Sequence, residues 1–525
     1  MDVLRMRGEF LPVHWRTDFP EAAAHGGFDV IIANPPWDVI LPYRAEFFRD
    51  YIPDYGRLDT REAMKAEKTL LARDPAVRGI WQAYRKRVTT LNAYFLKTYA
   101  SLQPRRGDGT FLRGHNNIYK VFLEKIYLLL AKDGLCGIIV PDNLNIDSAC
   151  TGLRRLLLQK TTIRELVTFV NRRKLFDIHG QYKFDVLTFM KRRPSPDAAF
   201  DAGFSWYDPV WLDGRPSAAH MAEHPLNAGR YHRRFRYPVA TIFRNDPDTL
   251  TIWEFGSAGG MNVLGKLKSF PGIGDPEEEL HILTSTEFNM TTDSDLFRRG
   301  GNGWPLFQGR TIHHYNASFG PVERRVDPVE GEKRLARRRR SLPDELPDRN
   351  FRLAWRVIAQ ATDSRSLIGT VIPPRVFCGN ALNTAEIIYK GRTVSDPELL
   401  SGVNVILSSL CSDFYVRLRS AKNVNAFIVR SIPVPRDISA IRKLGRLALP
   451  LYLGAEFAAF RGGVPEILDP EERIRRIALL DAMTARLYGL GSEEYGLVLD
   501  SFPLLDEVVK RLYREAFGRE EENGF

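Results

Sequence analysis

The sequence predicts an α/β fold whose first half forms a largely parallel sheet. Three observations support this prediction. An apolar, β-branched run at residues 28–33 ends abruptly in a rigid loop. Residues 116–140 show apolar side chains at helical spacing and then a second apolar run, and two more strand-like segments follow at 162–170 and 183–191. Helices that alternate with apolar strands are typical of crossover connections between parallel strands.

The first strand, FDVIIA at residues 28–33, is continuously apolar after its second residue. Such a run is typical of a parallel strand covered on both faces, so we expect it to be buried. It stops at Asn34, because Pro35 and Pro36 fix two φ angles and donate no N–H. The loop therefore lies at the carboxyl end of a strand, where open α/β sheets bind ligands.

The segments after the loop continue the alternation of helices and strands. In residues 116–140, NNIYKVFLEKIYLLLAKDGLCGIIV, the helical spacing ends at Lys-Asp-Gly and LCGIIV forms the next strand. Strands are expected at 162–170 and 183–191, and helices at 61–72, 78–102 and 151–159.

The loop residues suit a planar ligand that carries an amine. The Asn34 amide oxygen and the Pro35 carbonyl both accept hydrogen bonds from an exocyclic NH2, and the Trp37 indole stacks on the ring that carries it. Because these groups are acceptors and not strong bases, the nitrogen lone pair stays available as a nucleophile. This is the chemistry of amino-group methylation on a base extruded from a duplex. The competing interpretation is a Pro-Pro turn with a packing tryptophan.

Composition limits the other possibilities. The chain has 525 residues, with 75 basic and 64 acidic side chains and a net charge of +11, which permits a polyanionic partner. The four cysteines are scattered, so we expect neither a disulfide framework nor a metal site. No apolar run reaches membrane-spanning length and no signal peptide opens the chain, so we expect a cytoplasmic protein without a membrane segment.

Several motifs resemble one enzyme family. The segments HWRTDFPEAAAHGGFDVIIANPPWD, LLLAKDGLCGIIVPDNL and KLFDIHGQYKFDVLTFMK are similar to the N6-adenine DNA methyltransferases of type IIG restriction-modification enzymes and of the BREX and DISARM phage-defence systems. Residues 288–316, 351–383 and 399–435 follow the pattern of that family's target-recognition region. The resemblance implies that Asn34, Pro35, Pro36 and Trp37 are catalytic, although many members have Tyr or Phe in the last place.

The resemblance also implies a domain plan. It places the C-terminal half of a class I, Rossmann-like methyltransferase sheet in residues 1–195 and a connecting region in 196–285. An α+β target-recognition domain follows in 286–438, and a helical segment in 439–525. The implied cofactor is S-adenosyl-L-methionine, and the implied partner is double-stranded DNA.

One departure from the family concerns the cofactor. The family's acidic, Gly-rich cofactor turn lies upstream of the catalytic loop, and only 27 residues precede Phe28 here. Asp18 is the candidate cofactor residue in that short stretch. Each βα unit needs roughly a dozen residues. We therefore expect that a partner polypeptide or an upstream segment supplies the cofactor strands, that the chain is a fragment, or that it has lost catalysis. In each case the first strand would expose an unpaired, apolar edge.

Residues 250–260, LTIWEFGSAGG, offer a rival cofactor loop, in which Glu254 precedes Gly256, Gly259 and Gly260. A permuted methyltransferase would use it. Against this, no helix with a clear apolar period is expected to begin at Gly260, so the stretch is interpreted as a connection.

Candidate DNA contacts lie in the recognition region. Arg310, His313 and Arg365 are residue types that hold phosphate or read base edges. Arg356, in the sequence LAWRVIA, is expected to pack within a helix. The run KRLARRRR at residues 333–340 is either a phosphate contact or a solvated loop.

The expected function is site-specific adenine-N6 DNA methylation, by a subunit or C-terminal portion of a methyltransferase in a restriction-modification or phage-defence system. The alternative is a catalytically inactive DNA-binding specificity component. Protein glutamine methylation uses a similar loop on an amide nitrogen, but the long recognition-like C-terminal half argues against it.

Overall fold

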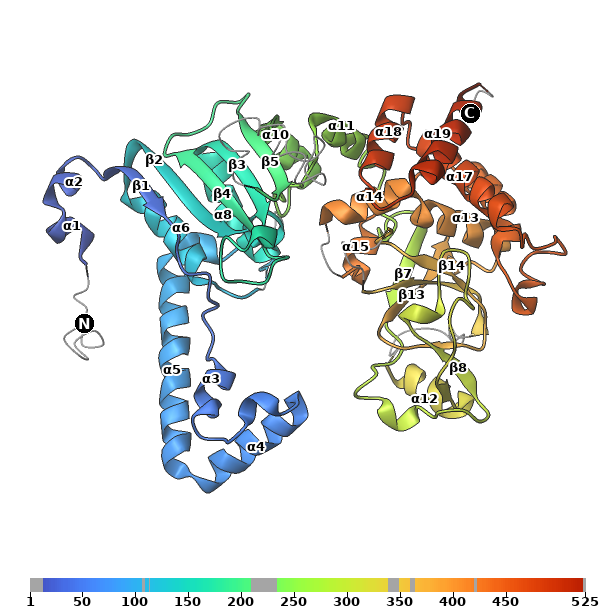
Figure 1. Ribbon diagram of the computed structural model, residues 1–525, viewed down its shortest axis with the longest axis horizontal. Coiled ribbons are helices and arrows are strands. Elements are labelled where there is room, and N and C mark those ends of the chain that lie inside the picture. The colour runs from blue at the N-terminus through green and yellow to red at the C-terminus, as the bar shows by residue number, and fades with distance from the viewer. Residues whose placement is uncertain are drawn as a thin grey trace. The chain divides into compact units, whose positions relative to one another are not determined.

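The structure is a computed structural model (Figure 1) that describes residues 13–105, 109–112, 114–208, 234–338, 349–358, 364–419 and 423–522. The chain divides into two compact units, residues 1–257 (unit 1) and residues 258–525 (unit 2). Among the described residues, unit 1 contains one sheet and unit 2 contains two, and each unit has its own core.

Unit 1 contains one mixed sheet and the helices around it. Its elements, in chain order, are α1 (Trp15–Asp18), α2 (Pro20–Ala24), β1 (Phe28–Ala33), α3 (Arg44–Arg49), α4 (Thr60–Arg73), α5 (Pro75–Thr98), α6 (Ile118–Leu129), β2 (Leu130–Pro141), α7 (Asn143–Ile146), α8 (Thr151–Lys160), β3 (Thr162–Val170), β4 (Lys183–Met190), β5 (Ala199–Trp206), β6 (Phe235–Pro238) and α10 (Val239–Asn245).

The six strands follow the order β1-β2-β4-β3-β5-β6. β1 is parallel to β2 and β3 is parallel to β5, whereas β4 runs antiparallel between β2 and β3. The carboxyl ends of β1, β2 and β3 therefore lie at one edge of the sheet, together with the beginning of β4. The predicted α/β fold with strands at 162–170 and 183–191 is confirmed.

The prediction that the first strand is buried was wrong. β1 is the terminal strand, and Val30 and Ile32 on one of its faces are 56% and 85% exposed. The physical reason is that helical residues pack on only the beginning of this face, where the rings of Trp15 and Phe19 contact Phe28. Among the described residues, β1 pairs with β2 alone.

Two other details differ from the sequence prediction. β2 already begins at Leu130, and the Lys-Asp-Gly expected to stop the preceding helix lies inside it. Asp133 there adopts a left-handed φ of 63°, and the β1–β2 register shifts at this point. In addition, residues 196–285 were expected to be a connecting region, but their strands β5 and β6 extend the sheet of unit 1.

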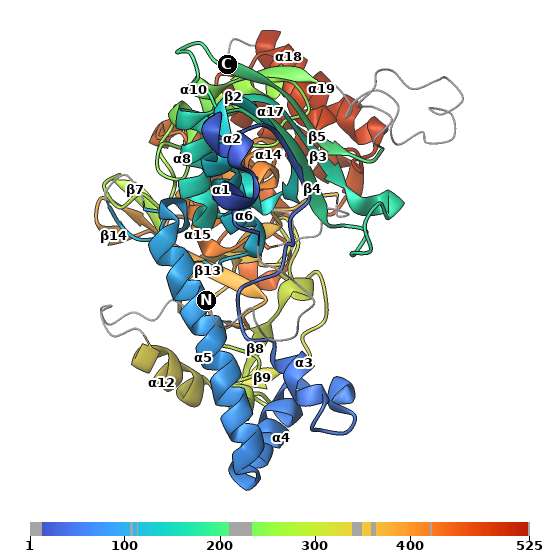
Figure 2. The ribbon, with the colours of Figure 1, turned by 90° about the vertical axis from the view of Figure 1, so that its left-hand side faces the viewer.

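A helical arm, defined as α3, α4 and α5, follows the Asn-Pro-Pro-Trp loop. Figures 1 and 2 show α5 running away from the sheet and α4 returning at its far end. The arm has a small aromatic core of Phe48, Tyr55 and Trp81. The Asp59 and Asp74 side chains cap the first turns of α4 and α5, so both helix boundaries follow from local sequence.

Unit 2 combines small sheets with a helical layer. Its elements are α11 (Ala258–Leu267), β7 (Leu280–Ser285), β8 (Trp304–Phe307), β9 (Arg325–Val326), α12 (Pro328–Arg338), β10 (Arg352–Arg356), β11 (Gly369–Ile372), β12 (Phe377–Cys378), β13 (Leu382–Tyr389), β14 (Arg392–Thr393), α13 (Pro397–Ser408), α14 (Leu410–Arg419), α15 (Ala426–Arg430), α16 (Ile438–Ala448), α17 (Pro470–Leu487), α18 (Ser492–Asp500) and α19 (Glu507–Glu522).

Two sheets organise the first part of unit 2. One contains β11, β10, β13, β14 and β7, and the other contains β12, β8 and β9. Glu287 and Arg352 form a buried ion pair, with Arg352 Nη2 2.8 Å from Glu287 Oε1, and Glu287 Oε2 accepts the Cys378 backbone N–H at 2.7 Å. Arg356 lies at the end of strand β10 and not in a helix, so that element of the prediction was wrong.

In the described part of the chain, no single helix is long and apolar enough to cross a membrane. The bent pair α13 and α14 reaches the required length and composition only when both helices are counted together. Most side chains of this pair are buried inside unit 2.

Candidate active site

The Asn-Pro-Pro-Trp loop leaves the carboxyl end of β1 and turns across the edge of the sheet. Pro35 is buried, whereas Asn34 and Pro36 are exposed and Trp37 is half-buried. The Asn34 amide makes no hydrogen bond with another described residue. Its oxygen is consequently available to a ligand.

The start of helix α6 fixes the path of the loop beyond Trp37. Asn117 donates its side-chain amide to the Trp37 carbonyl at 3.0 Å. Ile118 donates its backbone N–H to the Asp38 carbonyl at 2.9 Å, and Ile40 donates to the Asn116 carbonyl at 2.7 Å. These three bonds hold the chain on both sides of residue 39, so the loop is fixed by the protein as well as by its prolines.

The Trp37 ring packs against two phenylalanines at the same edge of the sheet. Its centroid lies 5.6 Å from the Phe176 ring at an interplanar angle of 62°, and 6.3 Å from the Phe184 ring at 32°. The indole Nε1 is buried and has no hydrogen-bond partner among the described residues. Trp37 therefore joins the edge of the core formed by Val167 and its neighbours.

One buried amide positions Phe176. Asn171, at the end of β3, donates its side chain to the Phe176 carbonyl at 2.9 Å and to the Ile178 carbonyl at 3.1 Å. Its Oδ1 accepts the Phe176 backbone N–H at 3.1 Å. Asn171 is fully buried. The sequence did not indicate Asn171 or Phe176, because the pairing depends on a loop path that no residue period reveals.

A charged cluster lies beside these rings. Lys183 Nζ is 2.6 Å from Glu254 Oε2, and Thr168 donates its hydroxyl to Asp185 Oδ1 at 2.5 Å. Burial raises the pKa of Asp142 to about 7, with a further rise from the Glu254 charge and an opposing effect of Lys183. Burial also raises the pKa of Asp185 well above its ordinary value, and the Asp142 charge adds to this.

The rival cofactor loop around Glu254 takes part in this cluster. Glu254 accepts hydrogen bonds from Lys183 and from Ser205 Oγ, the latter at 3.0 Å. A helix, α11, does begin at Ala258, contrary to the sequence prediction. However, residues 250–255 form no strand, whereas the family's turn follows one. Glu254 is therefore bound by Lys183 and Ser205, and the hypothesis of a permuted methyltransferase with its cofactor loop here gains no support.

Asp18, the candidate cofactor residue, lies at the end of α1. Its carboxylate accepts the His14 backbone N–H at 2.7 Å, so it closes its own helical turn. Among the described residues of unit 1, no acidic residue with a Gly-rich turn follows a strand in the way that the family's cofactor loop does. The described residues do not form a complete cradle for S-adenosyl-L-methionine.

The three candidate DNA-contacting residues differ in their surroundings. Arg310 is exposed and forms an ion pair with Glu323. The His313 ring lies 4.8 Å from the Phe319 ring, and burial, with the charges of Arg356 and Arg365, lowers its pKa to about 4. His313 is thus neutral at pH 7.

Arg365 is largely enclosed. Its side chain is 11% exposed, its Nε lies 2.7 Å from Asp413 Oδ2, and its Nη2 donates to the Ser408 carbonyl at 2.5 Å. Arg356 donates Nε to the Ile312 carbonyl at 3.1 Å, in agreement with the packed role expected for it.

The basic run at residues 333–340 is partly structural. In helix α12, Arg334 and Arg338 both bind the buried Asp293 carboxylate, at 2.8 Å and 2.6 Å. Residues 339 and 340 lie outside the described residues. The other two cations of the helix, Lys333 and Arg337, are exposed.

A mixed sheet whose edge carries an Asn-Pro-Pro-aromatic loop is typical of amino-group methyltransferases. Residues 87–176 match the family described as Eco57I restriction-modification methylase. The matched segment begins in α5 and ends at Phe176, so it includes β2, α8, β3 and Asn171. The resemblance to restriction-modification methyltransferases is thereby confirmed. A search of curated proteins finds no match.

Solved structures give weaker similarities. The type IIL restriction-modification enzyme MmeI in complex with DNA aligns over 93% of this chain and 57% of its own, with 10% identity and a TM-score of 0.43. The type IIG restriction endonuclease BpuSI aligns over 77% and 50%, with 10% identity and a TM-score of 0.30. A type I methyltransferase subunit from Streptococcus thermophilus aligns over 43% and 37%, with 13% identity and a TM-score of 0.22. This chain therefore spans about half the length of the first two.

Proposed function

We propose that this chain provides the catalytic loop and the target-recognition region of a site-specific DNA methyltransferase that modifies the N6 amine of adenine. The observation that carries the proposal is the rigid loop at the carboxyl end of β1, with an exposed and unbonded Asn34 amide three residues before the half-buried Trp37. The match of residues 87–176 to restriction-modification methylases supports it.

In this proposal Asn34 and the Pro35 carbonyl accept the two amine hydrogens of an extruded adenine, and Trp37 stacks on its ring. S-adenosyl-L-methionine supplies the methyl group when it is bound. The loop acts by orienting the amine, because its acceptors fix both N–H bonds while the lone pair points away from them. The held geometry, and not a strong base, then makes the nitrogen reactive.

The cofactor-binding strands are proposed to add to the open edge of β1. Its exposed Val30 and Ile32 are the kind of apolar side chains that a further strand and its helix would cover. A partner polypeptide or an upstream segment of a longer chain would provide that strand. Arg310, His313 and Arg365 remain proposed contributors to DNA binding from unit 2, and among these three only Arg310 is exposed, while it also pairs with Glu323.

A methyl-transfer assay tests the proposal. Labelled S-adenosyl-L-methionine and duplex DNA are incubated with the chain, alone and together with the polypeptide encoded next to it, and the DNA is digested to nucleosides. We expect N6-methyladenine with the complete pair. Asn34→Ala should abolish the product, whereas Asn34→Asp, which keeps an acceptor oxygen, should retain part of it. Product on cytosine, or full activity in Asn34→Ala, would contradict the proposal.

The alternative is a DNA-binding specificity component without activity of its own. The absence of a complete cofactor cradle among the described residues favours it. It predicts DNA binding, with no methyl transfer in any combination of polypeptides.

A further inference from the structure

Helix α5 has an unusual distribution of charge. Its 24 residues include no Asp or Glu, while five cations are spread along its length: Arg78, Arg85, Lys86, Arg87 and Lys97. All five are exposed. Among the described residues, none of them forms an ion pair, in contrast to the cations of α12, which bind Asp293.

This charge does not serve the stability of the helix. Only Val77 and Trp81 are buried in α5, so one side packs against the rest of the arm and the other side faces solvent. Three consecutive cations, Arg85 to Arg87, have no acidic partner three or four residues away, and such partners are what stabilises charged helix surfaces. The cations repel one another in the free protein, and a bound polyanion would relieve that repulsion.

Apolar groups flank the cations. Ile80, Leu91 and Tyr94 are 52%, 46% and 60% exposed and lie beside Arg87 on one flank of the helix. An open groove of about 570 Å³ between α3 and α5 is lined mainly by apolar and aromatic side chains such as Phe47 and Tyr84, with Arg87 and Glu46 as its charged residues. The arm thus offers aromatic and aliphatic surface next to positive charge.

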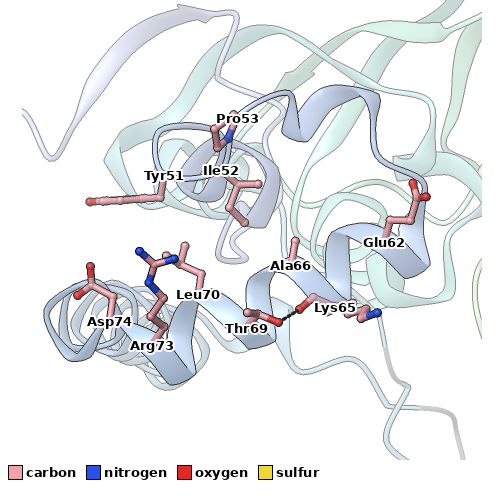
Figure 3. Close-up of a pocket in the computed structure, with 10 residues that line it drawn as sticks. All are labelled: Tyr51, Ile52, Pro53, Glu62, Lys65, Ala66, Thr69, Leu70, Arg73 and Asp74. Atoms are coloured by element: carbon pink, nitrogen blue, oxygen red, sulfur yellow. Dashed lines mark hydrogen bonds between the residues drawn. The ribbon is translucent and has the colours of Figure 1, made fainter.

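A second hollow lies on the arm, between residues 51–53 and helix α4. It has a volume of about 550 Å³, and its lining includes Tyr51, Lys65 and Arg73 together with the acidic Glu62 and Asp74. Figure 3 shows the Arg73 guanidinium directed toward the Tyr51 ring. Lys65 and Arg73 are exposed, and neither forms an ion pair with a described residue. The two cations and the two carboxylates of this lining balance, so the hollow adds no net positive charge to that of α5.

We propose that the helical arm, through the solvent face of α5, is a docking surface for the phosphate backbone of duplex DNA. The inference rests on the proposed function, since it adds a second contact surface for the same substrate. The length of the charged face favours DNA over a compact anion. Arg78 to Lys97 spans about 28 Å at 1.5 Å per residue, which is about eight base steps of 3.4 Å.

Contacts of this kind carry no sequence information, because the phosphate backbone is the same at every site. The arm therefore raises affinity for all duplexes alike. Choice of the target sequence stays with other parts of the protein.

Two charge-matched variants of the full chain test the inference. The first is the triple variant Arg85→Gln, Lys86→Gln, Arg87→Gln. The control is Lys132→Gln, Lys160→Gln, Arg164→Gln, which removes three exposed and unpaired cations at the opposite edge of the sheet from the Asn-Pro-Pro-Trp loop. Glutamine has a helix propensity similar to that of the three α5 residues that it replaces. Circular dichroism with thermal melting verifies that both variants fold.

Binding is measured by fluorescence anisotropy with two labelled duplexes of different sequence between 50 and 200 mM NaCl. We expect the α5 variant to bind about tenfold or more weakly at 100 mM salt, and its salt slope to decrease by about three. The loss should be equal for both duplexes. The control should bind within about twofold of the parent chain.

The other outcomes are distinguishable. Equal weakening of both variants would show an effect of net charge alone and would overturn the inference. Parent-like binding by the α5 variant would overturn it while leaving DNA as the substrate. If the α5 variant binds DNA like the parent chain but loses binding to an acidic polypeptide or to anionic vesicles, the arm serves another partner, and the inference is overturned. If the parent binds no duplex at 50 mM salt, the inference and the proposed function are both wrong.

Discussion

Replacing Asn171 by alanine tests whether one amide holds the loop that carries Phe176. The buried side chain makes three hydrogen bonds to the backbone of this loop, at 2.9, 3.1 and 3.1 Å. Each bond contributes about 1 kcal/mol net, so the free energy of local opening should fall by about 3 kcal/mol. Since 1.4 kcal/mol is a factor of ten, the open population rises by about two orders of magnitude.

Hydrogen exchange followed by mass spectrometry measures this opening in residues 172–182. Asn171→Ala should accelerate exchange there about a hundredfold, and methyl transfer should fall because Phe176 no longer supports the Trp37 ring. Asn171→Asp keeps the acceptor for the Phe176 N–H but places a buried carboxylate oxygen against the Phe176 and Ile178 carbonyls, so it should accelerate exchange at least as much as Asn171→Ala. The control is Gln103→Ala, which removes an exposed side-chain bond to the Leu96 carbonyl at the end of α5. Acceleration of less than about tenfold in Asn171→Ala would refute the reasoning.

Three further predictions concern single side chains. Trp37→Phe should keep methyl transfer within a few-fold, because it retains a stacking ring and removes an indole N–H that has no partner among the described residues, whereas Trp37→Ala should abolish transfer in the same assay. Glu287→Gln should lower the free energy of unfolding of unit 2 by about 3–5 kcal/mol in urea titrations, because it leaves the buried Arg352 charge uncompensated; a loss below about 1 kcal/mol would contradict this. Because the pKa of Asp142 is raised on folding, to about 7, its contribution to stability is present below the unfolded pKa and lost as pH rises through 7. Asp142→Asn should therefore flatten the pH dependence of thermal stability between pH 4 and 7, and an unchanged profile would exclude this assignment.

The parts of the fold that follow from local residue patterns were predictable. The strand at 162–170 was predicted with the bounds that β3 has, and the helix at 151–159 with one residue fewer than α8. The apolar period and the β-branched content of these segments agree with their burial, so propensity and tertiary packing point to the same element. The position of the Asn-Pro-Pro-Trp loop was predictable for the same reason, since its prolines end the strand wherever it is packed.

Features set by distant contacts were not predictable. The exposure of Val30 and Ile32 depends on what covers β1, and the apolar run of that strand carries no such information. The contact between Trp37 and Phe176 requires Asn171 to bind the backbone five and seven residues away. Strand β5, AFDAGFSW, has a central glycine and a Trp206 ring folded over it, so its sequence lacks the regular alternation that identifies a strand.

The open side of β1 links the solubility of this protein to its assembly. Sheet edges are usually protected by lysine, proline or a pronounced bulge. β1 holds neither lysine nor proline, and its register shift lies before Val30, so Val30 and Ile32 remain exposed beyond it. Two copies of the chain can pair with each other through such an edge, so strand-paired oligomers are expected to form as the concentration of the protein rises. A polypeptide that adds a strand to β1, as proposed above, would compete with this self-pairing and so help to keep the protein in solution.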